Sequence, residues 1–420
     1  MVTAMARKHI VIVGAGFGGL SAAHGLAGAD ADVTVIDRRN YHLFQPLLYQ
    51  VATAGLSPAQ IAQPIRSILR KASNVRVILG RVTGVDRQRR IVRLEDREIG
   101  YDVLVLATGS RHAYFGHDEW ERVAPALKKI DDATGIRRRI LSAFEHAEQT
   151  DDPAARRRFL TFVVIGAGPT GVEMAGAIAE LAHVALRYDF RTINPRDARI
   201  VLVEAGPRVL AAFPPTLSES ALRSLERLHV EVRLGKPVSE CDEMGVTIDD
   251  ERLEAATIIW AAGVASSSAA KWLGVEQDRV GRVVVGPDLA VPGHPEIFVI
   301  GDTAHAASAN GQPLPGLAPV AKQQGAYVAR VLRARIANRA APGPFRYRDY
   351  GTMATIGRRA AVADFGWLKV DGTLAWLLWG LIHVTFLIGF RNRFVVLFDW
   401  LWSYATFQSG ARLITGPGSH

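Results

Sequence analysis

The sequence has little cysteine: Cys241 is the only one among 420 residues. A single thiol cannot form a disulfide within the chain, and it cannot supply the ligands that a Cys-rich zinc or iron-sulfur site requires. The 12 histidines form no recognisable ligand cluster, so we expect no metal site. Disulfide reductases use a pair of cysteines, so the single cysteine also excludes their dithiol chemistry.

A long apolar leader is also lacking at the N-terminus. The first eight residues run into the short apolar stretch Ile10 to Val13 and then into glycines. This stretch is too short for the apolar core of a signal peptide, which favours a protein that starts in the cytoplasm.

The overall composition, 49% hydrophobic and 22% charged, is typical of a globular protein of more than one domain. The formal net charge of +9 is open to three explanations. It fits a nucleic-acid partner, an anionic membrane surface, or an arginine-rich composition without a specific partner.

The segment HIVIVGAGFGGLSAAHGL near the N-terminus reads as a strand, a glycine turn and a helix. Gly14 permits the tight turn, Gly16 lets backbone N–H groups approach a pyrophosphate, and Gly19 lets helix and strand pack closely. The next strand, VTVID, ends at Asp37, 23 positions after Gly14, where an acid accepts hydrogen bonds from a ribose. Glycine turns alone are common, but strand, helix and terminal acid together predict a dinucleotide site.

The same pattern returns in TFVVIGAGPTGVEMAGAIAEL, with Gly166, Gly168 and Gly171 in the turn and IVLVE, ending at Glu204, as the next strand. The 38 residues from Gly166 to Glu204 exceed the usual spacing of about 20, which predicts an extended helix followed by a polar loop. A carboxylate at this strand end favours NADH over NADPH, because a 2'-phosphate would face it. Arg208 nearby would partly offset that repulsion.

Three further segments have the form of a buried strand followed by a turn of small residues. They are YDVLVLATGS at 101–110, TIIWAAGV at 257–264 and EIFVIGDTA at 296–304. In the last segment, Asp302 follows the carboxyl end of the expected strand, which is where ligands bind in open α/β sheets.

The order of the motifs GAGFGG, ATGS, GAGPTG, AAGV and GDTA resembles that of the two-dinucleotide-binding-domain flavoproteins, over nearly the whole chain. The resemblance implies an α/β fold of two nested Rossmann-type domains, the first binding FAD and the second NADH. It assigns to FAD the residues Gly14, Gly16, Gly19, Asp37, Thr108, Gly109 and Asp302. It assigns to NADH the residues Gly166, Gly168, Gly171, Glu204 and Gly263.

Within that superfamily, several segments resemble the type II NADH:quinone oxidoreductases, which are single-chain NADH dehydrogenases that do not pump protons. These segments are NYHLFQPLLYQVATAGLSP at 40–58, GVEMAGAIAEL at 171–181, APVAKQQG at 318–325 and the tail at 387–416. The resemblance implies hydride transfer from NADH to FAD, followed by transfer of two electrons to a membrane quinone. It further implies a lipid bilayer surface as partner, a possible homodimer and no nucleic acid.

One position departs from the family pattern. Many members have Ala-Gln-x-Ala-x-Gln on the quinone side, whereas Pro319 replaces the first Gln here. A hydrogen-bond donor to a quinone carbonyl is therefore missing at that position. Lys322, Gln323 or a backbone group is the expected substitute.

Glu173 lies two residues after Gly171, in the first turn of the expected helix. A carboxylate there is stabilised by the helix dipole in any protein. The family resemblance implies a catalytic role instead, beside the flavin, in holding the nicotinamide half and helping proton delivery to quinone. Both explanations remain open at this point.

The C-terminal tail contains 19 residues without Asp, Glu, Lys or Arg, 372–390, followed by a second apolar stretch in which Asp399 is the only acid. Two helices lying in the membrane interface, one spanning helix and a buried dimer interface all fit this pattern. Arg391, Arg393 and Arg412 flank the apolar segments and would meet anionic headgroups. We expect a peripheral (monotopic) protein on the cytoplasmic face of the cell membrane.

The predicted domains are an FAD domain at 1–115 and 285–345, an NADH domain at 116–284 and a membrane-attachment region at 346–420. Another class of function shares both fingerprints, namely a soluble NADH-dependent reductase of a ferredoxin- or rubredoxin-like protein. A third possibility is that bound FAD and NADH only report the redox state to a partner. A soluble reductase of a small redox protein would have no use for an apolar, Trp-rich tail.

Overall fold

The computed structural model describes residues 7–308, 311–406 and 411–415, which form two compact units. Unit 1 consists of Met1–Leu43, Gln63–Arg111 and Val264–Tyr350. Unit 2 consists of Phe44–Ala62, His112–Gly263 and Gly351–His420. Each unit contains one of the two glycine-rich motifs.

The core of unit 1 is a six-stranded sheet in the order β20-β21-β9-β1-β2-β5. All its strand pairs are parallel except the edge pair β20–β21. The strands are β20 (Ala290–Val291), β21 (His294–Val299), β9 (Val103–Leu106), β1 (Lys8–Val13), β2 (Ala31–Asp37) and β5 (Val75–Leu79). The β-branched run of β1 is buried on both faces, as in parallel sheets that helices cover.

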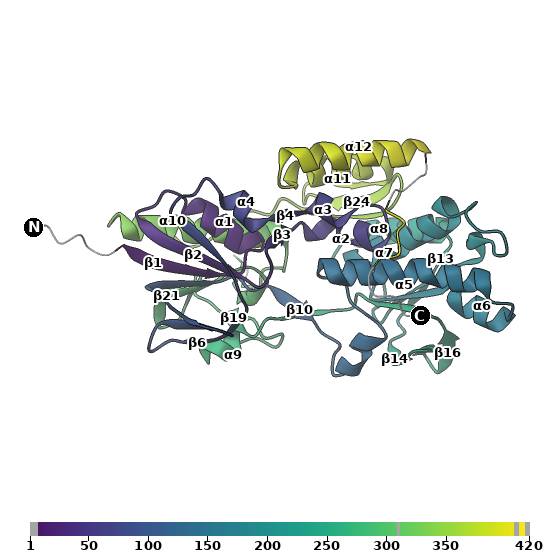
Figure 1. The fold of residues 1–420 in the computed structure, drawn as a ribbon, viewed down its shortest axis with the longest axis horizontal. Helices are drawn as coiled ribbons and strands as arrows, with labels where there is room; N and C mark the ends of the chain where they lie inside the picture. The colour runs from purple at the N-terminus through teal and green to yellow at the C-terminus, as the bar shows by residue number, and fades with distance from the viewer. Residues whose placement is uncertain (1–6, 309–310, 407–410, 416–420) are drawn as a thin grey trace, which may run out of the picture. The chain divides into compact units, whose positions relative to one another are not determined.

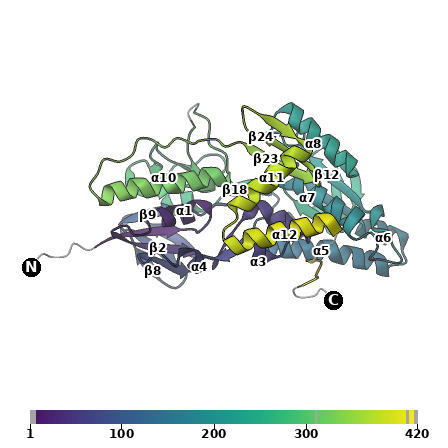
Figure 2. The same cartoon turned by 90° about the horizontal axis from the view of Figure 1, so that it is seen from above.

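Two helices of unit 1, α1 (Phe17–Gly25) and α10 (Ala318–Ile336), lie side by side (Figures 1 and 2). Glycines permit this close approach. A Cβ on Gly325 would lie 2.1 Å from the carbonyl oxygen of Gly18, and a Cβ on Gly25 would lie 2.4 Å from the Cβ of Ala329. The close contact fixes the start of α1, which follows directly after the first glycine turn.

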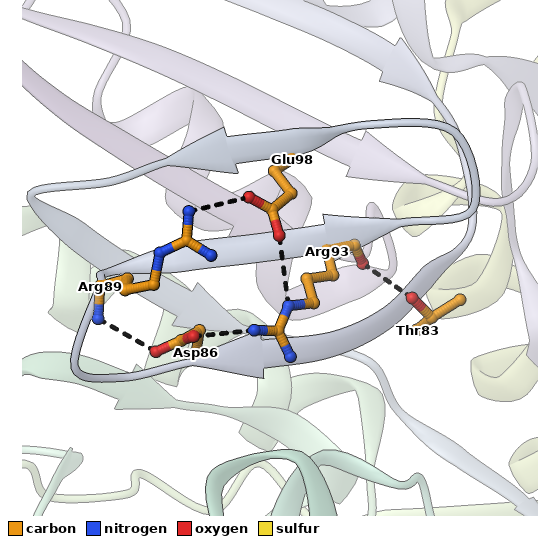
Figure 3. A network of polar contacts seen from close by, with 5 residues as sticks. All are labelled: Thr83, Asp86, Arg89, Arg93 and Glu98. Carbon is orange, nitrogen blue, oxygen red and sulfur yellow. Dashed lines mark hydrogen bonds and ion pairs between the residues drawn. The ribbon is translucent and has the colours of Figure 1, made fainter.

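Unit 1 also contains a three-stranded antiparallel sheet of β6 (Val82–Asp86), β7 (Ile91–Leu94) and β8 (Glu98–Gly100). Ion pairs cross it (Figure 3): Arg93 contacts Asp86 at 2.8 Å and Glu98 at 3.3 Å, and Arg89 contacts Glu98 at 3.3 Å. Because these pairs are exposed to solvent, each contributes little to stability. Some of the arginines that contribute to the positive net charge are therefore paired with carboxylates within unit 1.

The core of unit 2 is a four-stranded parallel sheet in the order β13-β12-β11-β17. Its strands are β13 (Val230–Leu234), β12 (Arg199–Glu204), β11 (Thr161–Ile165) and β17 (Thr257–Trp260). The helix after β11, α7 (Pro169–Glu180), continues into a π-helical turn, η3 (Leu181–Ala185), before the chain reaches β12. This extension and the loop after it account for the long spacing between the second glycine turn and Glu204.

The C-terminal part of unit 2 is a three-stranded antiparallel sheet followed by two helices. The sheet contains β23 (Thr352–Gly357), β24 (Ala360–Asp364) and β25 (Lys369–Asp371), and the helices are α11 (Gly372–Phe386) and α12 (Phe390–Thr406). The helices contact each other and run side by side in both views (Figures 1 and 2). Among the described residues, none of the helices has both the length and the apolar character needed to cross a membrane.

The remaining elements are shorter or lie away from the glycine turns. The helices are η1 (Gln45–Leu47), α2 (Leu48–Ala52), α3 (Pro58–Ile61), α4 (Ile65–Leu69), η2 (Asp118–Arg122), α5 (Ile130–Gln149), α6 (Pro153–Phe159), η4 (Pro195–Asp197), α8 (Pro215–Arg227), α9 (Ala269–Leu273) and η5 (Gly301–Thr303). The strands are β3 (Tyr41–Leu43), β4 (Ala62–Pro64), β10 (Ser110–His112), β14 (Val238–Asp242), β15 (Gly245–Ile248), β16 (Glu251–Glu254), β18 (Val264–Ser266), β19 (Val283–Val284) and β22 (Ala304–His305).

The units differ from the predicted domain boundaries by a few residues at 112–115 and 346–350, and more substantially in three other places. Residues 264–284, predicted with the NADH domain, belong to unit 1, because α9 buries Leu273 in the core beside β6. The tail from Gly351, predicted as a separate region, belongs to unit 2, because α11 packs on β24 and buries Trp379 to 1% exposure. Residues 44–62 lie in unit 2 as well, since α2 packs on α5 and α7.

Candidate dinucleotide sites

The first glycine turn connects β1 to α1 and uses each glycine differently. Gly14 has φ +99°, and a Cβ there would lie 2.3 Å from the carbonyl oxygen of Ala107. A Cβ on Gly19 would lie 1.8 Å from the carbonyl oxygen of Gly14, whereas a Cβ on Gly16 would meet nothing within 4 Å. Open space therefore lies beside Gly16 at the start of α1, where the backbone N–H groups of the first turn bind anions.

The carboxylate of Asp37, at the end of β2, holds this turn in place. Its Oδ2 accepts a hydrogen bond of 2.7 Å from the backbone N–H of Ala15, and its Oδ1 accepts one of 2.8 Å from the N–H of Arg39. The acid that the sequence assigns to a ribose thus also orders the loop that would bind the pyrophosphate.

The other predicted FAD residues lie at the carboxyl ends of β9 and β21. The Thr108 hydroxyl is 2.5 Å from that of Ser267, and Ser110 donates a hydrogen bond of 2.6 Å to Asp302. Gly109 has φ +70°, which keeps this turn tight. All seven predicted residues therefore lie within unit 1, at the carboxyl ends of parallel strands or in the segments that follow them.

Gln324 is a residue of this site that the sequence reasoning missed. It is 1% exposed, and its Oε1 accepts a hydrogen bond of 2.6 Å from the backbone N–H of Gly301. Gln324 therefore fixes the Gly-Asp turn that carries Asp302. A buried glutamine in the first turns of α10 was the available signal, but sequence alone does not show which side of the helix is buried.

The second glycine turn repeats this geometry in unit 2, between β11 and α7. Gly166 has φ +100°, and a Cβ there would lie 2.5 Å from the Cα of Ala262. A Cβ on Gly171 would lie 1.8 Å from the carbonyl oxygen of Gly166, and one on Gly168 would meet nothing within 4 Å. The same division of tasks among three glycines indicates a second place for a pyrophosphate.

Glu204 plays the part in unit 2 that Asp37 plays in unit 1. Its Oε2 accepts a hydrogen bond of 2.7 Å from the N–H of Ala167, and its Oε1 accepts one of 2.8 Å from the N–H of Gly206. Arg208 donates to the carbonyl oxygens of Phe213 at 3.0 Å and Ala211 at 2.7 Å. These bonds fix the guanidinium within its own loop and leave its positive charge unchanged.

Gly263 follows β17, one residue after Ala262, which packs on the second glycine turn. The ring of Phe115 lies directly over it, because a Cβ on Gly263 would be 2.4 Å from the Phe115 Cζ. The predicted NADH residues are thus brought together at the carboxyl ends of β11, β12 and β17. Phe115 is an additional neighbour that the sequence reasoning missed.

Glu173 lies on α7 and faces β23. The backbone N–H of Thr355 hydrogen-bonds its carboxylate, which lowers the pKa, but burial raises it more strongly, and the pKa of Glu173 lies at about 8. A carboxyl group with this pKa holds its proton near neutral pH and is able to donate it.

Two other residues of α7 also contact β23 and the turn after it. The carbonyl oxygen of Ile356 would lie 1.7 Å from a Cβ on Gly176. Glu180 accepts a hydrogen bond from the backbone N–H of Arg358, and burial raises the pKa of its carboxyl group. One face of α7 therefore attaches the C-terminal sheet, a task that the sequence does not indicate for Glu173.

The three predicted quinone-side residues lie in the first turns of α10. Pro319 occupies the first turn of the helix, where a missing N–H costs no helical hydrogen bond. The backbone carbonyl of Lys322 accepts a hydrogen bond of 2.8 Å from the Ser21 hydroxyl. The side-chain amide of Gln323 donates to the carbonyl of Arg348 at 2.8 Å and accepts its N–H at 3.0 Å, so it already has partners within unit 1.

The single cysteine lies in unit 2 and is partly buried. Burial raises the pKa of the Cys241 thiol to about 12, so thiolate is scarce at neutral pH. Within residues 7–308, 311–406 and 411–415, no group of His, Cys, Asp and Glu side chains is arranged to hold a metal ion.

The tail helices are held to unit 2 by one face each. Trp379 of α11 stacks on Trp400 of α12 at a centroid distance of 5.3 Å, and the indole N–H of Trp400 donates to Gln50 at 2.8 Å. Asp399, the only acid of the second apolar stretch, accepts a hydrogen bond from Gln60. The inward faces therefore carry the polar contacts and the stacked indoles.

The outward faces of the same helices are apolar and exposed. The exposed large side chains are Leu374, Leu377, Leu381, Phe386, Phe394, Leu397, Phe398, Leu401 and Trp402. Arg391 and Arg393 are exposed at the start of α12. Arg412, by contrast, is paired with Asp189, so it does not offer the free charge that the sequence predicts for headgroups.

Comparison with known proteins places these features in a family. Residues 8–325 match the model of the pyridine nucleotide-disulphide oxidoreductase family, and residues 350–406 match that of the NDH2 C-terminal domain. The chain is 44% identical over 424 residues to the type II NADH:quinone oxidoreductase Ndh of Mycobacterium tuberculosis, covering 97% of this chain and 90% of that protein. It is 32% identical to the type II NADH:quinone oxidoreductase of Staphylococcus haemolyticus, covering 85% of this chain and 89% of that protein.

A solved structure shows the same fold. NDH2 from Plasmodium falciparum in complex with NADH superposes with a TM-score of 0.88 at 20% identity, covering 98% of this chain and 100% of that one. The α/β architecture predicted from the order of motifs is thereby confirmed.

Proposed function

The chain belongs to the type II NADH:quinone oxidoreductases, and we propose that its two carboxylate-held glycine turns bind the two nucleotides of this reaction, FAD in unit 1 and NADH in unit 2. The enzyme oxidises NADH and reduces quinone, and it is flavin-dependent, as its family is. The overall change is NADH + H⁺ + quinone → NAD⁺ + quinol. FAD, when bound, supplies the acceptor for the hydride and the donor of two electrons to quinone.

The residues of unit 1 fit an FAD. The space beside Gly16 admits a pyrophosphate at the N-terminus of α1, and Asp37 fixes that loop while offering its remaining acceptor positions to a ribose. Asp302, fixed by Ser110, is the polar group available to the ribityl chain.

The residues of unit 2 fit NADH better than NADPH. Glu204 places a carboxylate where the adenine ribose would lie, and a 2'-phosphate there would be repelled. Arg208 keeps its positive charge, but the two carbonyls of its own loop fix its guanidinium, so we take Glu204 as the determinant of the preference. We therefore infer a preference for NADH.

Glu173 is proposed as the proton-carrying residue. Quinone reduction consumes one proton besides the hydride, and a carboxyl group with a pKa of about 8 is protonated at neutral pH. The N–H of Thr355 fixes the carboxyl group in one orientation. At the start of α10, Pro319, Lys322 and Gln323 remain the proposed neighbours of the quinone, with Gln323 also fixing Arg348.

The observation that carries the function is the combination of two dinucleotide turns with a single unreactive thiol. Cys241 is the only cysteine of the sequence, so the chain has no pair of thiols that could relay electrons. The electrons must therefore go directly to an acceptor from outside the chain.

The exposed apolar face of α11 and α12 is proposed to lie on the membrane, because a lipid-soluble quinone must be reached without crossing water. Burying one such large side chain stabilises binding by about 1.5–3 kcal/mol. Asp399 is turned inward to Gln60, which keeps that charge off the outward face. The positively charged start of α12, at Arg391 and Arg393, suits anionic headgroups on the cytoplasmic side.

The test is NADH oxidation by the purified full-length protein, compared across quinones, ferricyanide, oxygen, and a ferredoxin or rubredoxin. Quinones should give the highest kcat/KM. A higher value with a small redox protein would favour the soluble reductase, and no turnover with any acceptor would favour a redox reporter.

A further inference from the structure

An exposed aromatic ring covers the part of unit 2 where the nicotinamide half of NADH would lie. Phe115 is 69% exposed, yet its Cζ would be only 2.4 Å from a Cβ on Gly263, so its ring lies on the backbone of that glycine. Single exposed hydrophobic residues are common on protein surfaces, so the contact with a predicted nucleotide loop, rather than exposure, makes Phe115 a candidate ligand contact.

The backbone presents this ring in an unusual conformation. Phe115 has φ +53° and Gly116 has φ +100°. The left-handed region is disfavoured for a bulky residue, and such conformations concentrate at ligand sites.

The neighbours of Phe115 are firmly held, so the exposed position of the ring is part of the fold. The Tyr114 hydroxyl donates to the carbonyl of Ala124 at 2.9 Å, and its ring packs 5.0 Å from that of Trp260. The carbonyl of Ala113 accepts a hydrogen bond of 3.0 Å from the Trp260 indole. Tyr114 thus points into the core while the next side chain is turned outward.

The strand order identifies which half of the dinucleotide lies nearby. Glu204 ends β12 and marks the adenine ribose, and the turn after β11 marks the pyrophosphate. A dinucleotide that continues in the same direction passes over the carboxyl end of the next strand, β17. Gly263 follows β17, so the nicotinamide half lies at Gly263 and meets Phe115.

We propose that Phe115 contacts the nicotinamide ring of bound NADH where the dinucleotide passes Gly263. The inference rests on the proposed function, since it assigns a residue to the NADH site. The ring provides an apolar, polarisable surface for the nicotinamide, and the absence of a side chain at Gly263 leaves room for the ring.

The test compares Phe115→Ala and Phe115→Tyr with the wild-type holoenzyme, using ferricyanide as acceptor. Aromatic contacts of about 0.5–1.5 kcal/mol correspond to roughly 2- to 12-fold in affinity, so Phe115→Ala should raise the KM for NADH by that factor. Phe115→Tyr should retain the wild-type KM. The control is Tyr188→Ala, which removes another exposed ring of unit 2, 72% exposed, and should leave the KM unchanged.

ADP-ribose, which lacks the nicotinamide ring, separates this role from a distorted loop. Its inhibition constant should be the same in wild type and Phe115→Ala. An unchanged KM for NADH, or an inhibition constant for ADP-ribose that rises in step with it, would overturn the proposal. A wild-type protein that does not oxidise NADH would instead refute the proposed function itself.

Discussion

Glu173 of α7 accepts a hydrogen bond from the backbone N–H of Thr355, a residue of β23 in the C-terminal sheet. The second glycine turn begins the same helix, so one element both starts the nucleotide site and anchors the tail of the chain. Glu180, farther along α7, makes the corresponding contact with Arg358. The two carboxyl groups share a helix and an environment, which makes one a matched control for the other.

The first prediction concerns the pH dependence of quinone reduction. Glu173→Gln should lower turnover with quinone by about 100-fold, because a general acid is lost while the Thr355 N–H keeps an acceptor. In wild type, turnover should fall as pH rises through about 8, where Glu173 loses its proton, and the variant should lack this inflection. Reduction of ferricyanide needs no such proton and should stay unchanged.

Glu180→Gln is the control for this prediction, since burial also raises the pKa of Glu180 but no catalytic role is assigned to it. It should keep the wild-type pH profile. If Glu173→Gln showed the same fall in quinone turnover near pH 8 as wild type, the role of Glu173 would be purely structural.

The second prediction concerns stability, which follows from the same shift. The pKa of Glu173 is about 8 in the folded chain and about 4.5 in the unfolded one. Between these values the unfolded chain releases its proton and the folded chain keeps it, so the stabilisation present below pH 4.5 is lost as pH rises to about 8. The Tm of wild type, measured relative to that of Glu173→Gln, should therefore fall across this pH window. A difference between the two Tm values that stays constant with pH would contradict the raised pKa of Glu173.

The third prediction separates flavin binding from folding. Gly16→Val should fold, since a Cβ there meets nothing within 4 Å, but it should lose most of its flavin because the side chain occupies the pyrophosphate space. Gly19→Ala should instead destabilise the fold by about 3 kcal/mol or more, since its Cβ would lie 1.8 Å from the Gly14 carbonyl oxygen. Flavin-to-protein absorbance ratios and Tm values measure both effects, with Gly84→Val as control. If Gly16→Val kept full flavin occupancy, the assignment of the FAD pyrophosphate to this turn would be wrong.

The fourth prediction concerns the choice between NADH and NADPH. Glu204→Gln should narrow the ratio of the two kcat/KM values by about tenfold, because the carboxylate charge near a 2'-phosphate is removed while an acceptor for Ala167 remains. Glu226→Gln, an exposed substitution on α8, should leave the ratio unchanged. Equal use of both nucleotides by wild type would contradict this interpretation of Glu204.

The fifth prediction concerns the apolar face of the tail. The double variant Leu377→Ser/Leu381→Ser should reduce binding to anionic vesicles at least about tenfold, since both side chains are exposed in the absence of lipid. Its Tm should change little. Trp379→Ala should instead lower stability by about 3–5 kcal/mol, because that side chain is 1% exposed in the core. Unaltered vesicle binding by the double variant would mean that this face does not contact the membrane.

The sequence predicted those parts of the fold whose structure follows from the residues of one segment. Both glycine turns require positive φ and close packing, so the glycine spacing, together with the flanking strand and helix and the acids Asp37 and Glu204 at the strand ends, located them. The α/β class, the flanking strands and two tail helices were likewise predictable from apolar runs and turns.

Contacts between distant segments were beyond the reach of local pattern. Gly176 reads as an ordinary helix residue until β23 is packed against it, and the outward turn of Phe115 depends on Trp260, far along the chain. The place of the tail in unit 2 depends on Trp379, whose burial against α12 cannot be told from a membrane-facing tryptophan by composition. Arg412 reads as a free cation until Asp189 is placed beside it.

The most direct test of the central claim is an anaerobic two-step titration of the purified full-length protein, followed by flavin absorbance. A stoichiometric amount of NADH should bleach the visible band, and a stoichiometric amount of quinone should restore it, with no other acceptor present. A band that NADH does not bleach, or one that is bleached but not restored by quinone, would contradict the assignment as an NADH:quinone oxidoreductase.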